Sequence, residues 1–210
     1  MSEVRSGLLH LLANPWIYDT FQSAVGANAW RKRVIEAKLV PALTPDALVV
    51  DVGCGTGWVL QLLPRSVRYI GIDRNRAYID QARDEYVDRP AAEFRCDDVS
   101  LASAGVDFSA DAVLAIGLLH HLDDDECVQL LASVAQMLKP GGFVLTLDPV
   151  ISSGQSGLAR AIIRRDRGRS VRTADAYRAL LSRAFNRVEV FIDHAPLRIP
   201  YTGIVCLAYR

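Results

Sequence analysis

The chain has 210 residues, 50% of them hydrophobic and 23% charged, and its 24 Lys and Arg residues balance 24 Asp and Glu residues. This composition is typical of a globular domain and excludes a disordered, collagen-like or disulfide-stapled chain. The zero net charge also gives the chain no general attraction to nucleic acid or to anionic membranes.

Cysteine usage and hydropathy predict a cytoplasmic protein. Its cysteines lack the spacing of metal or redox motifs, so we expect reduced thiols and no metal site. They are Cys54, Cys96, Cys127 and Cys206. No apolar run approaches the ~20 residues that a membrane span needs. The apolar run Leu8–Leu12 is too short for a signal peptide, and Glu3 precedes it where a basic region would stand.

Hydrophobic periodicity predicts helices and strands that alternate along the chain. In the first half we expect helices over residues 14–40, 57–63 and 75–86, and strands over 48–52, 67–72 and 93–96. In the second half we expect strands over 112–116, 142–147, 188–192 and 204–209, helices over 124–138 and 174–184, and an irregular or partly helical segment over 151–172. Asn14 and Thr173 are the expected caps of the first and last helices. This alternation is typical of an α/β protein with a mostly parallel sheet.

A glycine-rich loop between the first strand and the next helix is the most informative segment. Residues 49–58 read Val-Val-Asp-Val-Gly-Cys-Gly-Thr-Gly-Trp. Such a loop lets the backbone approach a ligand closely and presents helix N–H groups to it, although it could also be a tight turn without a ligand. A dinucleotide fingerprint starting at Gly53 would need glycine where Trp58 stands, and no Gly-Lys-Ser/Thr follows for a phosphate-binding loop.

Five segments in chain order resemble the motifs of class I S-adenosylmethionine (SAM)-dependent methyltransferases. Asp51–Gly57 matches that family's glycine motif without a gap. The others resemble the second strand with its terminal acid, the adenine-contacting turn, the segment after strand four and the turn before strand five. They are Tyr69–Asp73, Cys96–Val99, Leu118–Leu122 and Leu138–Gly142. The resemblance covers about residues 45–150.

The resemblance implies a Rossmann-like, doubly wound sheet of seven mostly parallel strands, with an antiparallel last strand, helices on both faces and an N-terminal helical cap. We expect a single domain over residues 1–210. Within it, residues 1–44 would form the cap, residues 45–150 the SAM-binding core, and residues 151–210 an acceptor-side insertion with the closing strands. SAM is the cofactor that the resemblance implies.

Several cofactor contacts follow from the resemblance and from side-chain chemistry. Asp73 lies 22 residues after Asp51 at a strand end, where a carboxylate can accept both ribose hydroxyl protons. Asp51 faces the amino-acid end of SAM or braces the glycine turn, and both readings stay open. Asp97 can accept from the adenine amino group while the Asp98 backbone N–H donates to the ring, unless both are ordinary surface acids. Arg74 lies on the adenine face or in solvent.

The remaining expected cofactor contacts come from the cap, the glycine loop and the ends of strands three and four. Tyr18 and Gln22 share a helical face and carry polar ends, so we expect them to close the SAM site. The others are Gly53, Cys54, Gly55, Gly57, Val99, Ile116 and Gly117.

Two histidines follow strand four, at the sheet edge where open α/β sheets bind ligands. Methyl transfer requires alignment of the acceptor and, for a protonated nucleophile, a base. His120 or His121 is a candidate base, or the pair is only a packed turn with one ring bonded to backbone. Asp148 ends strand five at the same edge, where it binds substrate or holds the following loop.

Arginine is concentrated between residues 160 and 172, a region that commonly forms part of the acceptor site in the family that the chain resembles. Guanidinium groups suit carboxylate or phosphate, so Arg167, Arg169 and Arg172 are candidate contacts for an anionic acceptor. An RNA contact and a solvated basic loop with internal partners such as Asp166 are the alternatives.

Together these features predict methyl transfer from SAM to a small-molecule, sugar or peptide-metabolite acceptor, with oxygen or nitrogen as the favoured acceptor atom. An RNA methyltransferase is the first alternative, although the zero net charge argues against a nucleic-acid partner. A SAM-binding partner protein without turnover is the second. The acceptor and the oligomeric state stay open, because the fold does not specify them.

Overall fold

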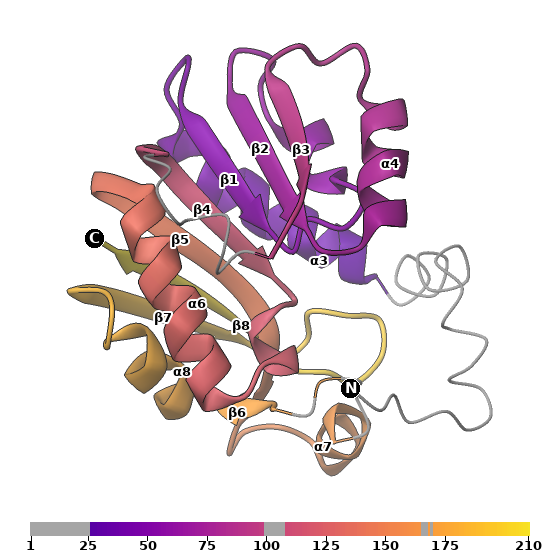
Figure 1. Ribbon diagram of the computed structural model, residues 1–210. Coiled ribbons are helices and arrows are strands. Elements are labelled where there is room, and N and C mark those ends of the chain that lie inside the picture. The colour runs from indigo at the N-terminus through magenta and orange to yellow at the C-terminus, as the bar shows by residue number, and fades with distance from the viewer. Residues whose placement is uncertain (1–25, 99–107, 165–167, 169) are drawn as a thin grey trace.

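A mixed β-sheet with helices on both faces organises the chain (Figure 1). The computed structural model describes residues 26–98, 108–164, 168 and 170–210. The strands of the main path are β1 (Leu48–Val52), β2 (Arg68–Asp73), β3 (Ala92–Cys96), β4 (Ala110–Ile116), β5 (Leu138–Ile151), β7 (Arg187–Asp193) and β8 (Gly203–Tyr209). Their spatial order is β3-β2-β1-β4-β5-β8-β7.

Strand directions agree with the expected fold. Neighbours from β3 to β5 pair in parallel, whereas β8 is antiparallel to both β5 and β7. The Rossmann-like sheet with an antiparallel last strand is therefore confirmed. One strand was not predicted: β6 (Arg172–Thr173) pairs in parallel with the end of β5. It is only two residues long, so no periodicity could reveal it.

Helices lie on both faces of this sheet (Figure 1). The α-helices of the described residues are α3 (Ala27–Val34), α4 (Arg76–Glu85), α6 (Asp124–Met137), α7 (Gly157–Ile163) and α8 (Ala174–Leu181); α7 lies beyond one end of the sheet. Shorter helical segments are a π-helical turn (Ile35–Leu39) and the 3₁₀ helices η2 (Val40–Ala42), η3 (Trp58–Leu62) and η4 (Leu119–His121). No helix in the described part of the chain is long and apolar enough to cross a membrane.

Local signals set most helix ends. Thr173 caps α8 as predicted, accepting a hydrogen bond from the Ala176 N–H. The predicted helix over 57–63 is only the 3₁₀ helix η3, which starts after Gly57 and ends at Leu62, with Leu63 in an extended conformation after it. Pro64 follows directly and disfavours helical geometry at the residue before it. Of the predicted helix over residues 14–40, the part from 14 to 25, with the Asn14 cap, lies outside the described residues.

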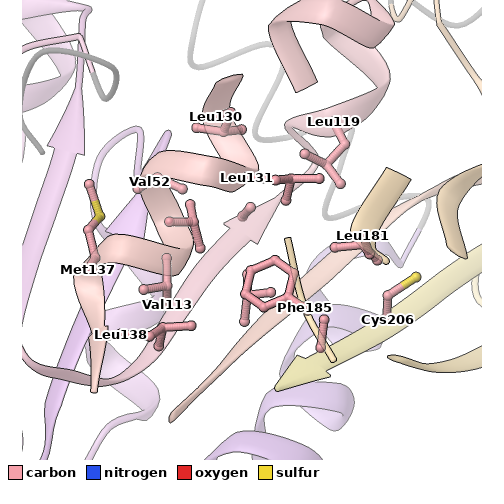
Figure 2. Packing of buried hydrophobic residues seen from close by; sticks show 14 of the residues in the cluster. Val52, Val113, Leu119, Leu130, Leu131, Met137, Leu138, Leu181, Phe185 and Cys206 are labelled. Carbon is pink, nitrogen blue, oxygen red and sulfur yellow. The ribbon is translucent and has the colours of Figure 1, made fainter. Parts of the chain in front are cut away.

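Each face of the sheet carries its own hydrophobic cluster. Along β4, Val113 and Ala115 belong to one cluster and Ala112 and Leu114 to the other, because successive strand side chains point to opposite faces. Figure 2 shows the first cluster, in which side chains from α6 and α8 pack over the strands. The second cluster lies under α3 and α4. Burial of a side chain such as Leu131 stabilises the fold by about 1.5–3 kcal/mol.

The strand order places the loops that carry the predicted site at one edge. β1 lies between β2 and β4. The strands after β1 are therefore added first on one side of it, as β2 and β3, and then on the other side, as β4 and β5. In open α/β sheets, ligands bind in the crevice at the carboxyl ends of the strands where this reversal occurs. The loops that follow β1, β2 and β4 leave from that edge.

Candidate functional site

The glycine loop turns sharply at the end of β1. The backbone N–H groups of Gly53 and Cys54 both donate to the carbonyl oxygen of Ile72 at the end of β2, at 2.8 and 3.2 Å. Gly53, Gly55 and Gly57 have φ angles of +73°, +55° and +74°. Residues with a Cβ rarely adopt this left-handed region, so the alternating glycines define the shape of the loop.

Two of these glycines have different surroundings. A Cβ on Gly57 would lie 2.6 Å from Cε1 of Phe94, so the aromatic packing beneath the loop leaves no room for a side chain. A Cβ on Gly55 would meet no atom of the described residues within 4 Å. The backbone at Gly55 is therefore open to an approaching ligand.

The carboxylate of Asp73 lies beside this loop at the end of β2. Its Oδ2 accepts from the Gly55 N–H at 2.9 Å and its Oδ1 accepts from the Asn75 N–H at 2.8 Å. The side chain is only half-buried, and each carboxylate oxygen can accept a second hydrogen bond. Asp73 is thus fixed by backbone donors and can still accept from a ligand hydroxyl pair.

The expected adenine-binding residues lie next to Asp73. The Asp97 N–H donates to the Asp73 carbonyl oxygen at 3.2 Å, which continues the strand contact past β3. The Asp98 N–H donates to Oδ1 of Asp97 at 2.8 Å, so the donor that we expected to face the ring has an internal acceptor here. Asp97, Asp98 and Arg74 are all exposed.

Asp51 lies below the loop and is 2% exposed. Its Oδ2 accepts from the Tyr69 hydroxyl at 2.8 Å. The pKa of Asp51 is raised to about 7, mainly because the carboxyl is buried. The charge of the nearby Asp73 also raises this pKa, whereas the hydrogen bond from Tyr69 lowers it. This hydrogen bond joins β1 to β2 just before the glycine loop, and both readings of Asp51 stay open.

Cys54 contributes backbone rather than side chain to the loop. Its thiol packs in the core cluster, and a Cβ on Gly71 would lie 2.9 Å from its Sγ. Burial raises the pKa of the Cys54 thiol, and the charges of Asp51 and Asp73 raise it further. The side chain is therefore unsuited to act as a nucleophile.

A buried histidine–carboxylate pair lies at the ends of β4 and β5. Nδ1 of His120 is 2.7 Å from Oδ1 of Asp148, and the same oxygen accepts from the His120 backbone N–H at 3.1 Å. His120 is 7% exposed and Asp148 2%. A carboxylate only accepts hydrogen bonds, so Nδ1 is the donor, and the tautomer of imidazole that carries its proton on Nδ1 has its lone pair on Nε2.

Two glycines flank the free edge of this ring. A Cβ on Gly117 (φ +65°) would lie 3.8 Å from Cε1 of His120, whereas a Cβ on Gly168 would overlap Cδ2. Nε2 lies between Cε1 and Cδ2 in the imidazole ring. Nε2 of His120 is therefore flanked by the two glycines.

The other residues predicted around the transfer point have different surroundings. His121 is exposed, and its ring centroid is 4.0 Å from that of His120. Ile116 is half-buried. The Gly117 N–H donates to the Leu147 carbonyl oxygen at 2.7 Å, which holds the end of β4 against β5. Asp148, which we expected to bind substrate or to hold the following loop, is buried, and its Oδ1 accepts from the ring and backbone nitrogens of His120.

The arginine segment is only partly described. Arg167 and Arg169, together with Tyr18, Gln22 and Val99, lie outside the described residues, so their predicted roles stay predictions. Arg172 does not face the crevice as predicted, because it is 8% exposed. Its guanidinium donates to Asp124 and to the carbonyl oxygens of Leu119 and Leu122. These internal acceptors occupy the fork that we had assigned to an anionic acceptor.

Two residues of this site were not predicted. A Cβ on Gly117 would lie 3.8 Å from Nη2 of Arg31, so the guanidinium of this α3 residue and the ring of His120 approach the same point. Arg31 follows Trp30 in the sequence, but helical spacing drew attention only to the apolar stripe. The second residue is Gly168. A single glycine within a run of arginines was a signal for a close approach of the backbone.

Comparisons with known proteins agree with this geometry. The Methyltransferase domain family matches residues 49–142. Acetylserotonin O-methyltransferase of Mus musculus is 30% identical over 172 residues, which cover 73% of this chain and 43% of that protein. Probable tRNA methyltransferase 9B of Mus musculus is 32% identical over 99 residues, which cover 47% of this chain and 21% of that protein. The chain thus spans less than half the length of these curated relatives.

A solved structure extends the likeness beyond the family match. The pyocyanin biosynthetic protein PhzM superposes with a TM-score of 0.73 at 21% identity, over 98% of this chain and 62% of that one. The sheet order, the glycine loop and the strand-end carboxylate together define a SAM-binding methyltransferase fold. The chain belongs to the class I SAM-dependent methyltransferases.

The residues present fit SAM, the methyl donor of this family. The open backbone at Gly55 leaves space for a ligand, and Asp73 offers acceptors to a ribose. The lone-pair edge of His120 lies next to Gly117 at the end of β4, on the same edge of the sheet.

Proposed function

We propose that the chain transfers the methyl group of SAM to a hydroxyl or amine of a small molecule, with His120 as the general base. The buried pair of His120 and Asp148 carries this proposal. The pair lies at the carboxyl ends of β4 and β5, and Gly117 lies beside Cε1 of the ring.

Asp148 and His120 have distinct tasks in this mechanism. Asp148 holds the Nδ1 proton of His120 and so keeps the lone pair on Nε2, where it can take the proton of an acceptor. When bound, SAM supplies an electrophilic methyl carbon on a sulfonium. The protein then has to align the acceptor atom at about 3–3.5 Å, in line with the bond to sulfur.

The glycine loop and its neighbours hold the cofactor. Gly55 offers backbone without a side chain, and Asp73 accepts the ribose hydroxyls. Asp51 precedes the loop and accepts a hydrogen bond from the Tyr69 hydroxyl, which ties β1 to β2. Arg31 brings a positive charge to the Gly117 end of the crevice.

A small acceptor is supported by the more extensive of the two curated matches. The name of the O-methyltransferase relative states a small hydroxylated acceptor, and its match extends over 73% of this chain. A base at His120 suits such an acceptor, because a hydroxyl must lose its proton during transfer.

An RNA acceptor is the second candidate, since a tRNA methyltransferase is among the relatives. That match covers only 47% of this chain. The balanced charge of the chain also supplies no general attraction to the phosphate backbone. A SAM-binding protein without turnover is the third candidate. The release assay described next distinguishes it from the small-molecule and RNA methyltransferases.

The test measures S-adenosylhomocysteine released from SAM in the presence of a panel of phenols, alcohols and amines, with bulk tRNA as a separate arm. We expect release with a small molecule. His120→Gln should reduce turnover by about 100-fold or more while leaving S-adenosylhomocysteine binding unchanged. His121→Gln, the matched control on the same turn, should retain turnover.

Three outcomes would contradict the proposal. Release with tRNA alone would favour the RNA acceptor, and binding of SAM without release in any arm would favour the non-catalytic protein. Full turnover of His120→Gln with an unchanged pH dependence would remove His120 as the base.

A further inference from the structure

We propose that Arg172 is a positioning residue that fixes the His120 ring against Asp148 by tying the turn of η4 to the end of β5. The inference rests on the proposed function, because the orientation of the ring serves catalysis only when His120 is the base. The orientation itself can be measured without knowing the acceptor.

The side chain of Arg172 binds both ends of the turn that carries His120. Nη1 donates to the Leu119 carbonyl oxygen and Nη2 to the Leu122 carbonyl oxygen, each at 2.8 Å. Nη1 also donates to the Ser170 carbonyl oxygen at 3.0 Å, and Nε donates to Oδ1 of Asp124 at 2.8 Å. The guanidinium therefore bridges the carbonyl groups on either side of the two histidines.

The backbone next to Arg172 adds a third contact to the same turn. The Ser170 N–H donates to the His120 carbonyl oxygen at 3.1 Å. Gly168 packs so closely against His120 that a Cβ there would overlap Cδ2 of the ring and lie 2.6 Å from the carbonyl oxygen of the same residue. The segment that ends at Arg172 thus covers η4 from residue 119 to residue 122.

The backbone of Arg172 connects this turn to the strand that carries Asp148. Arg172 pairs with Val150 and Thr173 with Ile151, where β6 runs beside the end of β5. Asp148 lies two residues before Val150 on β5. Arg172 therefore connects both partners of the His120–Asp148 pair. Its backbone pairs with β5, the strand that carries Asp148, and its side chain binds the turn that carries His120.

The contacts require the geometry of arginine. Its planar fork presents five N–H donors and can bind two carbonyl groups and a carboxylate together. Lysine offers a compact ammonium, so it can keep the positive charge without reproducing all of these directions. A role in positioning consequently depends on the fork and not on the charge alone.

The experiment follows the His120 Nδ1 proton by NMR in protein labelled with ¹⁵N-histidine. A proton shared with a carboxylate at 2.7 Å should give a downfield resonance that is protected from solvent exchange. The resonance is assigned to His120 because it is absent from the spectrum of His120→Gln. We expect Arg172→Gln to increase its exchange rate by about tenfold or more, whereas S-adenosylhomocysteine binding, measured by calorimetry, stays unchanged.

Three further variants separate positioning from general stability. Arg178→Gln removes an exposed arginine of α8 that donates to the Val188 carbonyl oxygen, and it should leave the resonance unchanged. Asp124→Asn removes the charge of the ion-pair partner but keeps a side-chain oxygen that can accept from Nε of Arg172, so it should also leave the resonance unchanged. Arg172→Lys should fall between wild type and Arg172→Gln.

Two results would overturn the inference. One is a resonance as protected in Arg172→Gln as in wild type. The other is wild-type protection in Arg172→Lys, which decides the question even if Arg172→Gln does not fold. Failure of the proposed function looks different, because turnover would then be insensitive to His120→Gln while Arg172 still controlled the Nδ1 proton.

Discussion

At the scale of single residues, Gly55 and Gly57 show how one motif serves two purposes. Both adopt a left-handed backbone, so alanine at either position would be strained. Only Gly57 lies against Phe94, however, and only Gly55 is open. The glycines of this loop therefore divide between packing and access, and their spacing in the sequence does not tell which is which.

Gly57→Ala should lower stability more than Gly55→Ala, because it adds a clash with Phe94 to the backbone strain. We expect a loss of about 1–2 kcal/mol for strain alone in Gly55→Ala and a larger loss in Gly57→Ala, measured by urea unfolding. Gly55→Ala should nevertheless abolish S-adenosylhomocysteine binding under conditions where it is folded. Equal stabilities of the two variants, or tight binding by Gly55→Ala, would contradict this interpretation.

The buried carboxyl of Asp51 makes stability depend on pH. Its pKa of about 7 in the folded protein lies above the ordinary value, so the folded state holds a proton that the unfolded state has lost. Stability from this group therefore falls as pH rises towards 7. Asn at this position can still accept from the Tyr69 hydroxyl but does not titrate.

Asp51→Asn should consequently become more stable relative to wild type as pH rises. We expect the difference to change by about 2–3 kcal/mol between pH 5 and pH 8 in urea unfolding. Asp111→Asn is the control, because the pKa of Asp111 is shifted in the opposite direction. Although burial raises the pKa of Asp111, hydrogen bonds from Lys139 and the Leu48 N–H lower it overall. The stability that Asp111 contributes is lost only as pH falls through that lowered value, so its difference should be constant over this range.

At the scale of elements, local sequence patterns located nearly every strand and helix of the described chain. β1 coincides with the predicted 48–52, and β8 begins one residue before the predicted 204–209. β5, predicted over 142–147, extends over Leu138–Ile151. Its extra length follows from pairing of Leu138 with β4 at its start and from pairing with β8 and β6 at its far end, and such pairing does not appear in the periodicity of one segment.

Contact between α3 and β8 also depends on tertiary structure. Trp30 of α3 lies over Gly203 at the start of β8, where a Cβ would be 2.5 Å from Cη2 of the indole. The glycine lets the helix approach the sheet. This close approach also sets the position of Arg31, the next residue of α3.

Gly203→Ala should push Trp30 outward and destabilise the protein by about 1–3 kcal/mol, the usual range for overpacking. Trp30→Phe has a shorter ring and should relieve the clash. In a double-mutant cycle measured by urea unfolding, the two substitutions should therefore couple by about 0.5 kcal/mol or more. Strict additivity would show that the indole does not determine the separation of helix and sheet.

At the scale of the whole molecule, a ligand that binds only the folded chain must stabilise it. At 100 times its dissociation constant, a ligand adds about 2.7 kcal/mol, which corresponds to a rise in Tm of roughly 5–10 °C for a chain of this size. We expect this shift with S-adenosylhomocysteine and none with NAD, since Trp58 occupies the place of the third glycine in a dinucleotide fingerprint.

Asp73→Ala provides the control for that thermal measurement. It removes the carboxylate at the end of β2 that is placed to accept ribose hydroxyls. The S-adenosylhomocysteine shift should disappear in this variant. A shift retained in Asp73→Ala, or an equal shift with NAD in wild type, would mean that the crevice binds adenosyl ligands in another way.

The sequence by itself determined the features that depend on neighbours along the chain. Helix and strand periods and the Thr173 cap are local, and the periods were sufficient to predict the α/β sheet. The resemblance to the SAM family came from five short motifs in chain order, of which the glycine loop is the first. The tertiary structure decided which partner each side chain receives. His120 meets Asp148 because β4 and β5 are neighbours in the sheet. Arg172 turns inward because β6 places it beside that pair, and contacts between segments about 30 to 50 residues apart leave no periodic trace in the sequence.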